Sequence, residues 1–122
     1  GSIKTAKVLL ESGKININEG DKTHKTALMY AALQKYHKIV TLLLNRDADV
    51  NKQDSQGLTA LMLAIQSESL KTTNIILDAH PDLTLQDEFG QTCLIFAAKK
   101  NYHNACARMI QNGAQINSQN NN

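Results

Sequence analysis

The chain has 122 residues, 42% of them hydrophobic and 20% charged, which suits one domain with a buried core. Its 13 basic and 11 acidic residues leave a net charge of +2, too small for binding driven by phosphate neutralisation alone. No apolar run is long enough to cross a membrane, and the N-terminus lacks a secretory hydrophobic region. Few aromatics beside many Leu, Ala, Ile and Lys favour helices.

The first predicted element is an apolar helix early in the chain. Gly1-Ser2 is typical of the remnant of a cleaved tag and is set aside. Ile3, Ala6, Leu9 and Leu10 then form an apolar stripe at helical spacing, with no helix before them to cover it. We therefore expect upstream sequence or another molecule to cover this N-terminal face.

From residue 21 onward the sequence repeats every 33 residues. At three positions of the unit, the same residue recurs in all three units, which chance does not explain. The matching positions are Asp21, Asp54 and Asp87, then Thr26, Thr59 and Thr92, then Leu28, Leu61 and Leu94.

Each unit predicts a turn, a short helix, a second turn and a longer helix. The aspartate opens the turn, and Gly57 and Gly90 follow three residues later, where a positive φ suits glycine. Each threonine stands where a hydroxyl can cap the first helix. Neither helix can bury its apolar face alone, so neighbouring units must stack. The side chains expected to be nearly fully buried are Leu28, Leu43, Leu61, Ile76 and Leu94.

The period and the segments TALMYA, TALMLA and TCLIFA resemble the ankyrin repeat. The resemblance implies an all-α solenoid of stacked helix-turn-helix repeats with short hairpin-like fingers. It covers residues 21–118 and extends backward into the preceding half-unit. The expected divisions are 1–20 for the tag remnant and the second half of an N-terminal repeat, 21–53 and 54–86 for two repeats, 87–119 for a C-terminal capping repeat and 120–122 for a polar tail. Arg108, in place of Leu42 and Ile75, supports the capping expectation because the last outer face meets water.

Several positions depart from the ankyrin pattern. His24 stands where the later units have Gly57 and Gly90. Lys35, Glu68 and Asn101 occupy the place of the usual glycine between the two helices. Because a non-glycine residue at positive φ costs on the order of 1 kcal/mol, we expect modest stability.

The sequence contains no motif that predicts catalysis or a cofactor. The four histidines and the two cysteines, Cys93 and Cys106, lack the clustering of a metal site. No phosphate-binding glycine loop occurs, and no Ser or Cys stands in a nucleophile motif. We therefore expect a protein that is not an enzyme, with no cofactor, no metal and no small-molecule substrate.

The resemblance places partner-binding residues on the concave face, formed by the fingers and the first helices. The positions carried over are Lys22, Thr23, Lys25, Leu33, Gln34, Ser55, Gln56, Leu58, Gln66, Ser67, Glu88, Phe89, Gln91, Lys99 and Lys100. Tyr30, Leu63 and Phe96 should border the same groove, with packing between repeats as the equal alternative. Leu58 and Phe89 are expected as exposed apolar anchors on the turn tips.

These expectations favour a scaffold that binds a protein or peptide in the concave groove, as part of a longer intracellular protein, in the cytoplasm or the nucleus. Two alternatives stay open: a chromatin-associated reader of modified tails or nucleic acid, and a purely structural spacer. A methyl-lysine reader needs several aromatics together, and only Phe89 and Phe96 lie close in the repeat register. Nucleic acid is disfavoured because acidic residues are interspersed among the lysines, and no membrane partner is expected.

Overall fold

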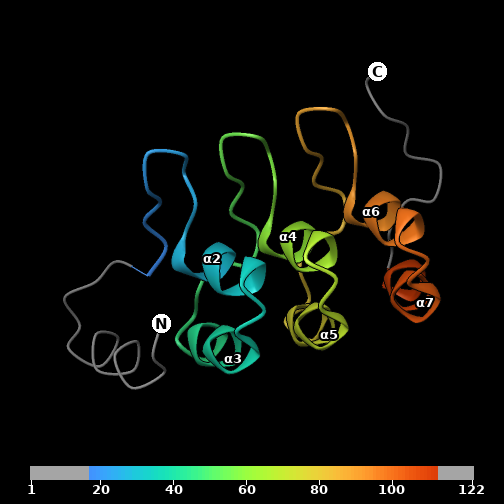
Figure 1. Cartoon of the computed structure of the whole chain (residues 1–122), viewed down its shortest axis with the longest axis horizontal. Coiled ribbons are helices and arrows are strands. Elements are labelled where there is room, and N and C mark those ends of the chain that lie inside the picture. Colours follow the sequence, from blue (N-terminus) through green and yellow to red (C-terminus); the bar gives the residue numbers. More distant parts are fainter. Residues whose placement is uncertain (1–16, 113–122) are drawn as a thin grey trace.

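The computed structural model describes residues 17–112, which form two parallel rows of helices beneath three projecting loops (Figure 1). The row next to the loops contains α2 (Ala27–Leu33), α4 (Ala60–Gln66) and α6 (Cys93–Lys99). The outer row contains α3 (His37–Asn45), α5 (Leu70–Leu77) and α7 (His103–Gln111). Strands are absent from residues 17–112, so the expected all-helical stack is confirmed.

The main helix contacts among the described residues lie within one unit or between neighbouring units. Within the units α2 packs on α3, α4 on α5 and α6 on α7. Between units α2 packs on α4 and α4 on α6, while α3 packs on α5 and α5 on α7. This nearest-neighbour pattern is typical of a solenoid, in which stacking completes the core that one unit cannot bury alone.

The buried leucines run through the middle of the stack as the period predicts. Leu28, Leu61 and Leu43 expose 1%, 2% and 3% of their surface, Ile76 exposes none and Leu94 exposes 9%. Ala32, Ala64 and Ala97 are fully buried, and their small side chains let neighbouring helices approach closely. The predicted core and its register are therefore confirmed.

Each loop is a tight hairpin that an aspartate begins, and we call residues 21–25, 54–58 and 87–91 the first, second and third fingers. In the second finger, Asp54 N donates to Leu58 O at 2.9 Å and Gly57 N donates to Asp54 O at 2.9 Å. The other two fingers repeat both bonds at the same positions. Asp54 Oδ1 also accepts from the backbone nitrogens of Gln56 and Leu58, each at 2.9 Å. The carboxylate thus accepts hydrogen bonds from backbone nitrogens that have no backbone acceptor in the turn.

Neighbouring fingers are hydrogen-bonded to each other near their tips. Ser55 N donates to Thr23 O and Glu88 N donates to Gln56 O, both at 2.9 Å. Between the second and third fingers there is no room for a side chain at position 57, because Gly57 has φ +79° and an added Cβ would lie 2.8 Å from Asp87 Cα. The three fingers therefore form one continuous surface.

The threonine caps form in two of the three units. Met29 N donates to Thr26 Oγ1 at 3.4 Å, and Met62 N donates to Thr59 Oγ1 at 3.3 Å. Thr92 precedes α6 with the same extended backbone, but its buried hydroxyl makes no hydrogen bond. The cap prediction is confirmed for the first two units and wrong for the third.

Six non-glycine residues among those described have positive φ. Four were expected: His24 at 63°, Lys35 and Glu68 at 64° and Asn101 at 60°. Asp47 at 64° and His80 at 54° end the second helices and were not expected. The sequence does contain an indication of these two positions: Gly113 stands 33 residues after His80, and glycine is typical of a positive φ.

The two ends of the chain lie outside the described residues. The expected helix at Ile3–Leu10, its coverage, the polar tail at 120–122 and the repeat boundaries therefore stay predictions. Arg108 is described and its side chain is half-buried, while the capping role of the last repeat stays a prediction. Arg108 reaches back from α7 to α5, where Nη2 donates to Asp78 Oδ1 at 2.7 Å.

Truncation of the central core tests the register. Leu61→Ala should lower the free energy of unfolding by about 2–5 kcal/mol, because the central unit packs on both neighbours and cannot collapse into the cavity. Urea denaturation measures this loss beside exposed Lys52→Ala as the control. Equal effects of the two variants would contradict the register.

Glycine at a positive-φ position should stabilise the chain. Lys35→Gly removes the strain of φ 64° and should raise the free energy of unfolding by up to about 1 kcal/mol. Lys38→Gly, three residues later within α3, is the matched control and should lower it by about 1 kcal/mol. Denaturation midpoints that shift in the same direction would show that Lys35 carries no strain.

Candidate binding face

The structure separates the expected partner-binding residues into three groups by exposure. Exposed side chains belong to Lys22, Thr23, Tyr30, Gln34, Ser55, Gln56, Gln66, Glu88, Phe89, Lys99 and Lys100. Half-buried side chains belong to Lys25, Leu33 and Ser67. Buried side chains belong to Leu58, Leu63, Gln91 and Phe96.

A groove lies between the second and third fingers and the end of α4. Its volume is about 210 Å³, and its exposed lining comes from Gln56, Gln66, Glu88 and Phe89. Phe89 is 50% exposed at the tip of the third finger. The buried side chains of Leu58, Asp87 and Gln91 complete the lining. The structure thus brings together residues from two fingers and one inner helix.

Leu58 is not the exposed anchor that the sequence suggested. Only 8% of its surface is exposed, and it belongs to the hydrophobic core. The residue lies on the returning arm of the second finger, directly before the helix cap Thr59, rather than at the tip. Its backbone nitrogen is bonded to Asp54 Oδ1, so the finger turn holds this position against the core. The expectation of an exposed Leu58 is wrong.

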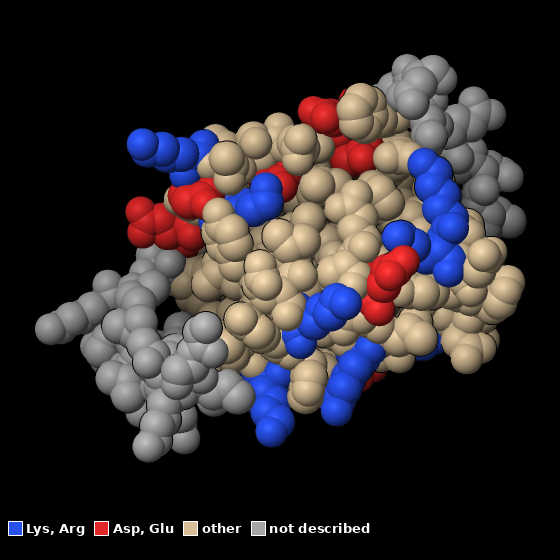
Figure 2. Space-filling model, viewed as in Figure 1, with Lys and Arg blue, Asp and Glu red and all other residues tan. Residues whose placement is uncertain are grey.

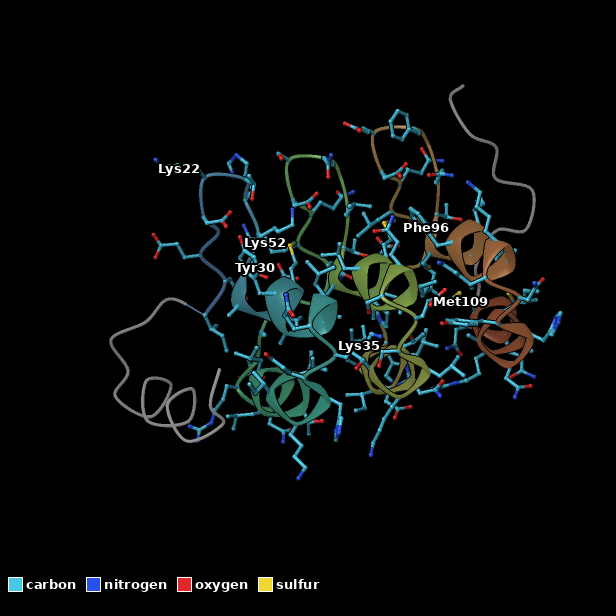
Figure 3. The ribbon with its side chains drawn as sticks, viewed as in Figure 1. Lys22, Tyr30, Lys35, Lys52, Phe96 and Met109 are labelled. Carbon is cyan, nitrogen blue, oxygen red and sulfur yellow. The ribbon has the colours of Figure 1, made fainter. Side chains whose placement is uncertain are left out.

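Leu63 and Phe96 also belong to the core rather than to the groove surface. They expose 3% and 8% of their surface, whereas Tyr30 at the same repeat position exposes 43%. Figure 3 labels Tyr30 on α2 and Phe96 on α6. The alternative of packing between repeats therefore holds for Leu63 and Phe96. Gln91 is likewise buried, so its expected surface role is wrong as well.

Tyr30 fastens the first finger to the first inner helix. Its hydroxyl donates to Asp21 Oδ2, while Asp21 Oδ1 accepts from Thr23 N at 2.9 Å and Lys25 N at 3.0 Å. The hydrogen bond from Tyr30 is the main reason that the pKa of Asp21 is well below its ordinary value. The same bond raises the pKa of Tyr30, because the phenol must stay protonated to donate.

Most lysines expected around the groove already have partners in the chain. Lys25 Nζ lies 2.9 Å from Asp54 Oδ2, whose side chain is fully buried, and this hydrogen bond raises the pKa of Lys25. Lys100 Nζ lies 3.1 Å from Glu68 Oε1. The Gln91 amide lies between two charges: it donates to Asp87 Oδ2 at 3.1 Å and accepts from Lys99 in the orientation that satisfies both. Lys25 is therefore a structural residue, which its sequence position alone did not reveal.

Basic and acidic side chains are intermixed over the visible face of the molecule (Figure 2). A surface that neutralises a phosphate backbone needs a continuous basic field, which this pattern does not provide. The mixed surface expected from the sequence is therefore what this view shows.

The described residues offer neither a metal cluster nor an activated thiol. Residues 17–112 contain no group of three His, Cys, Asp or Glu that could hold an ion. Burial raises the pKa of the Cys93 thiol to about 12 and also raises that of Cys106. Both thiols are therefore protonated at neutral pH and poorly nucleophilic. Over the same residues, none of the helices has the length and apolar character of a membrane span.

The chain was compared with models of known protein families. A family model described as ankyrin repeats, in three copies, matches residues 1–54 and 48–120 of the chain. A search of curated proteins found no match.

Removal of the Tyr30 hydroxyl should make the melting temperature change less between pH 7 and acid pH. Because the bond lowers the pKa of Asp21 in the folded state, its contribution is present at neutral pH and is lost as pH falls below about 4. The melting temperature of Tyr30→Phe should therefore lie below that of the unaltered chain at pH 7, and the gap should close in acid.

Tyr36→Phe is the matched control for this comparison. Tyr36 is 41% exposed, close to the 43% of Tyr30, and its hydroxyl makes no side-chain hydrogen bond in the described structure. Circular dichroism melts across this pH range would contradict the assignment if both variants behaved alike.

Proposed function

Because the chain belongs to the ankyrin-repeat family, whose members are generally protein–protein interaction modules, we propose that it binds a partner protein in the groove between the second and third fingers. The observation that carries the proposal is Phe89, an aromatic side chain half-exposed at a fingertip beside polar groups. Apolar anchors ringed by polar residues are the usual arrangement of binding energy in protein interfaces.

The groove chemistry fits a short, extended segment of a partner. The amides of Gln56 and Gln66 are exposed and make no side-chain hydrogen bonds within the described structure. Each amide offers both a donor and an acceptor, which matches the alternating groups of a peptide main chain. Phe89 supplies the face on which an apolar side chain of the segment packs. The segment would lie across the two fingers, with Glu88 at its edge.

The rigidity of the fingers supports the same proposal. Glu88 N is bonded to Gln56 O at 2.9 Å, so the two fingers that line the groove are held at a set separation. Asp87 Oδ1 accepts from Phe89 N at 2.9 Å, which sets the position of the anchor residue in its turn. A site that is organised before binding loses less conformational entropy when the partner arrives.

The two alternatives have less support from the described residues. An aromatic cage for a methylated lysine needs several rings around one point, but Phe96 is buried and the Tyr30 hydroxyl is engaged by Asp21 at the first finger. A purely structural spacer makes no use of the groove in which Phe89 lies beside the exposed Gln56 and Gln66. The proposed role is non-catalytic and requires no cofactor.

Substitution of the anchor tests the proposal. Peptides selected from a random display library on the unaltered chain should lose at least tenfold in affinity for Phe89→Ser, because the anchor contributes more than about 1.4 kcal/mol. Fluorescence polarisation measures the affinities, and the helical signal and melting temperature should stay nearly unchanged.

Leu70→Ser is the matched control, since Leu70 is 52% exposed but stands at the start of the outer helix α5. It should leave the affinity unchanged. If Leu70→Ser abolishes binding while Phe89→Ser does not, the groove is not the site. If no peptide is selected at all, the spacer alternative replaces the binding role.

A further inference from the structure

The groove between the second and third fingers is lined by two carboxylates and, among the described residues, by no basic side chain. Asp87 is 8% exposed, whereas Glu88 is exposed, and the other lining side chains are uncharged. Figure 2 shows acidic atoms, and no basic ones, at the tip of the third finger. The groove is therefore locally acidic, although the chain as a whole has a net charge of +2.

The junction between the first and second fingers shows how a buried carboxylate at this position is compensated. Asp54, the equivalent of Asp87, has a side chain without exposed surface, and Lys25 Nζ lies 2.9 Å from its Oδ2. Lys25 stands on the returning arm of the preceding finger. Because a charge removed from water is costly without an opposite charge beside it, this lysine stabilises the carboxylate of the next finger.

The junction between the second and third fingers keeps the carboxylate of the repeat but not its cation. The 33-residue period places the uncharged Leu58 at the position of the lysine. Asp87 makes no ion pair with any described residue, and it accepts only from uncharged donors: the backbone nitrogens of Phe89 and Gln91 and the Gln91 amide. Lys99 is held by the amide oxygen of Gln91 rather than by either carboxylate of the groove.

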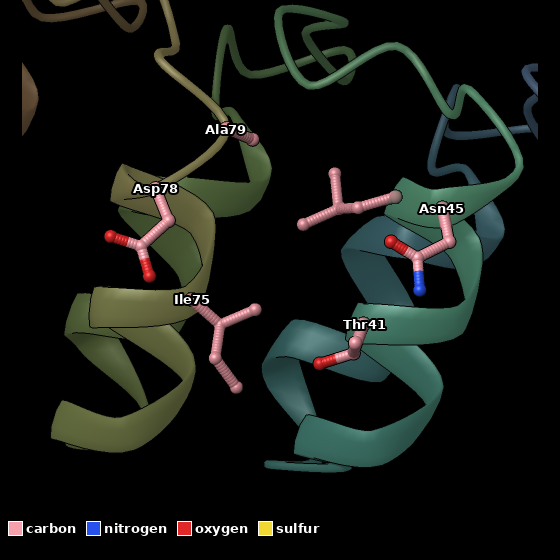
Figure 4. A pocket seen from close by; sticks show the side chains of 6 residues that line it. Thr41, Asn45, Ile75, Asp78 and Ala79 are labelled. Atoms are coloured by element: carbon pink, nitrogen blue, oxygen red, sulfur yellow. The ribbon is translucent and has the colours of Figure 1, made fainter.

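A larger hollow on the outer helices shows that size alone does not indicate a charged occupant (Figure 4). Its volume is about 390 Å³, and it lies between α3 and α5. Among its described lining residues Asp78 alone is charged, but its carboxylate points away from the hollow and lies 2.7 Å from Arg108 Nη2. That hollow therefore has no charge without a partner, whereas both carboxylates of the finger groove lack a cation.

We propose that the partner segment bound in the finger groove carries a basic side chain, which pairs with Glu88 next to the apolar side chain that packs on Phe89. This inference rests on the binding role proposed above and specifies the chemistry of the partner. The Glu88 carboxylate has no hydrogen-bond or ion-pair partner within the described structure, so both oxygens can accept from an ammonium or a guanidinium.

The buried Asp87 strengthens this preference without contacting the partner. Its charge lies one residue from Glu88 in the same turn, and binding excludes water that otherwise screens it. An acidic side chain in the groove would face two like charges, which is a strong means of rejecting a wrong partner. The groove thus selects a segment in which a basic residue stands close to an apolar one.

The experiment uses peptides selected from a random display library on the unaltered chain. The selected peptides should share a Lys or Arg close to their apolar anchor. Glu88→Gln removes the charge but keeps the shape of the side chain, and should weaken binding about three- to tenfold, since one exposed ion pair contributes modestly. Glu88→Lys reverses the charge and should weaken binding more than about tenfold.

Glu68→Gln is the matched control for the loss of charge. Glu68 is exposed and pairs with Lys100 at 3.1 Å, but it stands in the turn between α4 and α5. This variant should leave the affinity measured by fluorescence polarisation unchanged. Circular dichroism confirms that all variants are equally folded.

Salt and a second substitution in the peptide separate charge from shape. Added NaCl screens the ion pair, so it should weaken binding to the unaltered chain and have little effect on Glu88→Gln. Replacing the basic residue of the peptide by Gln should cost as much as Glu88→Gln, and the two changes together should cost no more than either alone.

The inference is overturned if the selected peptides lack a basic residue, or if Glu88→Gln binds them as tightly as Glu68→Gln does. In both cases a loss of binding in Phe89→Ser still supports the groove as the site, so the binding role stands. If Phe89→Ser leaves the affinity unchanged, or if no peptide is selected, the binding role fails and this inference fails with it.

Discussion

The carboxylate at the base of each finger is the interaction on which the rest of the binding face depends. One oxygen of Asp21, Asp54 or Asp87 accepts from two backbone nitrogens of its own turn, and this shapes the finger. The second oxygen binds a different group in each unit: the Tyr30 hydroxyl, the Lys25 ammonium or the Gln91 amide. The bonds to the backbone nitrogens are common to all three repeats, which explains why an aspartate recurs every 33 residues. The bond to the second oxygen joins each finger to a helix, to the preceding finger or to its own returning arm.

These bonds make the surface continuous even though the helices are short. Ser55 N and Glu88 N each donate to the finger before them, so the position of one tip determines the next. At the third finger, Gly57 leaves room for the backbone of Asp87, which a Cβ at position 57 would meet at 2.8 Å. A helix of seven residues has little stability alone, and its order comes from packing on its neighbours. The exposed side chain of Phe89 is therefore presented by a rigid array rather than by a free loop.

The period of 33 was sufficient to predict the stack, the buried leucines, the caps of two units and four of the strained turns. It is insufficient for the site, because the period does not distinguish residues that vary to meet a partner from residues that vary to fit internal contacts. Lys25, Leu58 and Gln91 share one position, yet Lys25 pairs with the buried Asp54, Leu58 enters the core and Gln91 bonds Asp87. A residue can therefore differ between repeats because its contacts within the protein differ, and not only because it binds a partner. The sequence does not separate these two possibilities, whereas the exposure of the side chain does: Phe89 is half-exposed and Phe96 is buried.

On the outer helices, too, equivalent positions in neighbouring repeats have different contacts. At position 108 the repeat has an internal occupant, because Arg108 bridges Asn74 and Asp78, whereas at position 75 Ile75 leaves the corresponding gap open. The backbone is equivalent in both places, so the difference lies in one side chain and its charge. A solenoid of near-identical units repeats the same backbone, so its surface differs from unit to unit only through the side chains. In this chain two such differences are the exposed ring of Phe89 on the third finger and Ile75, which leaves the gap between α3 and α5 open.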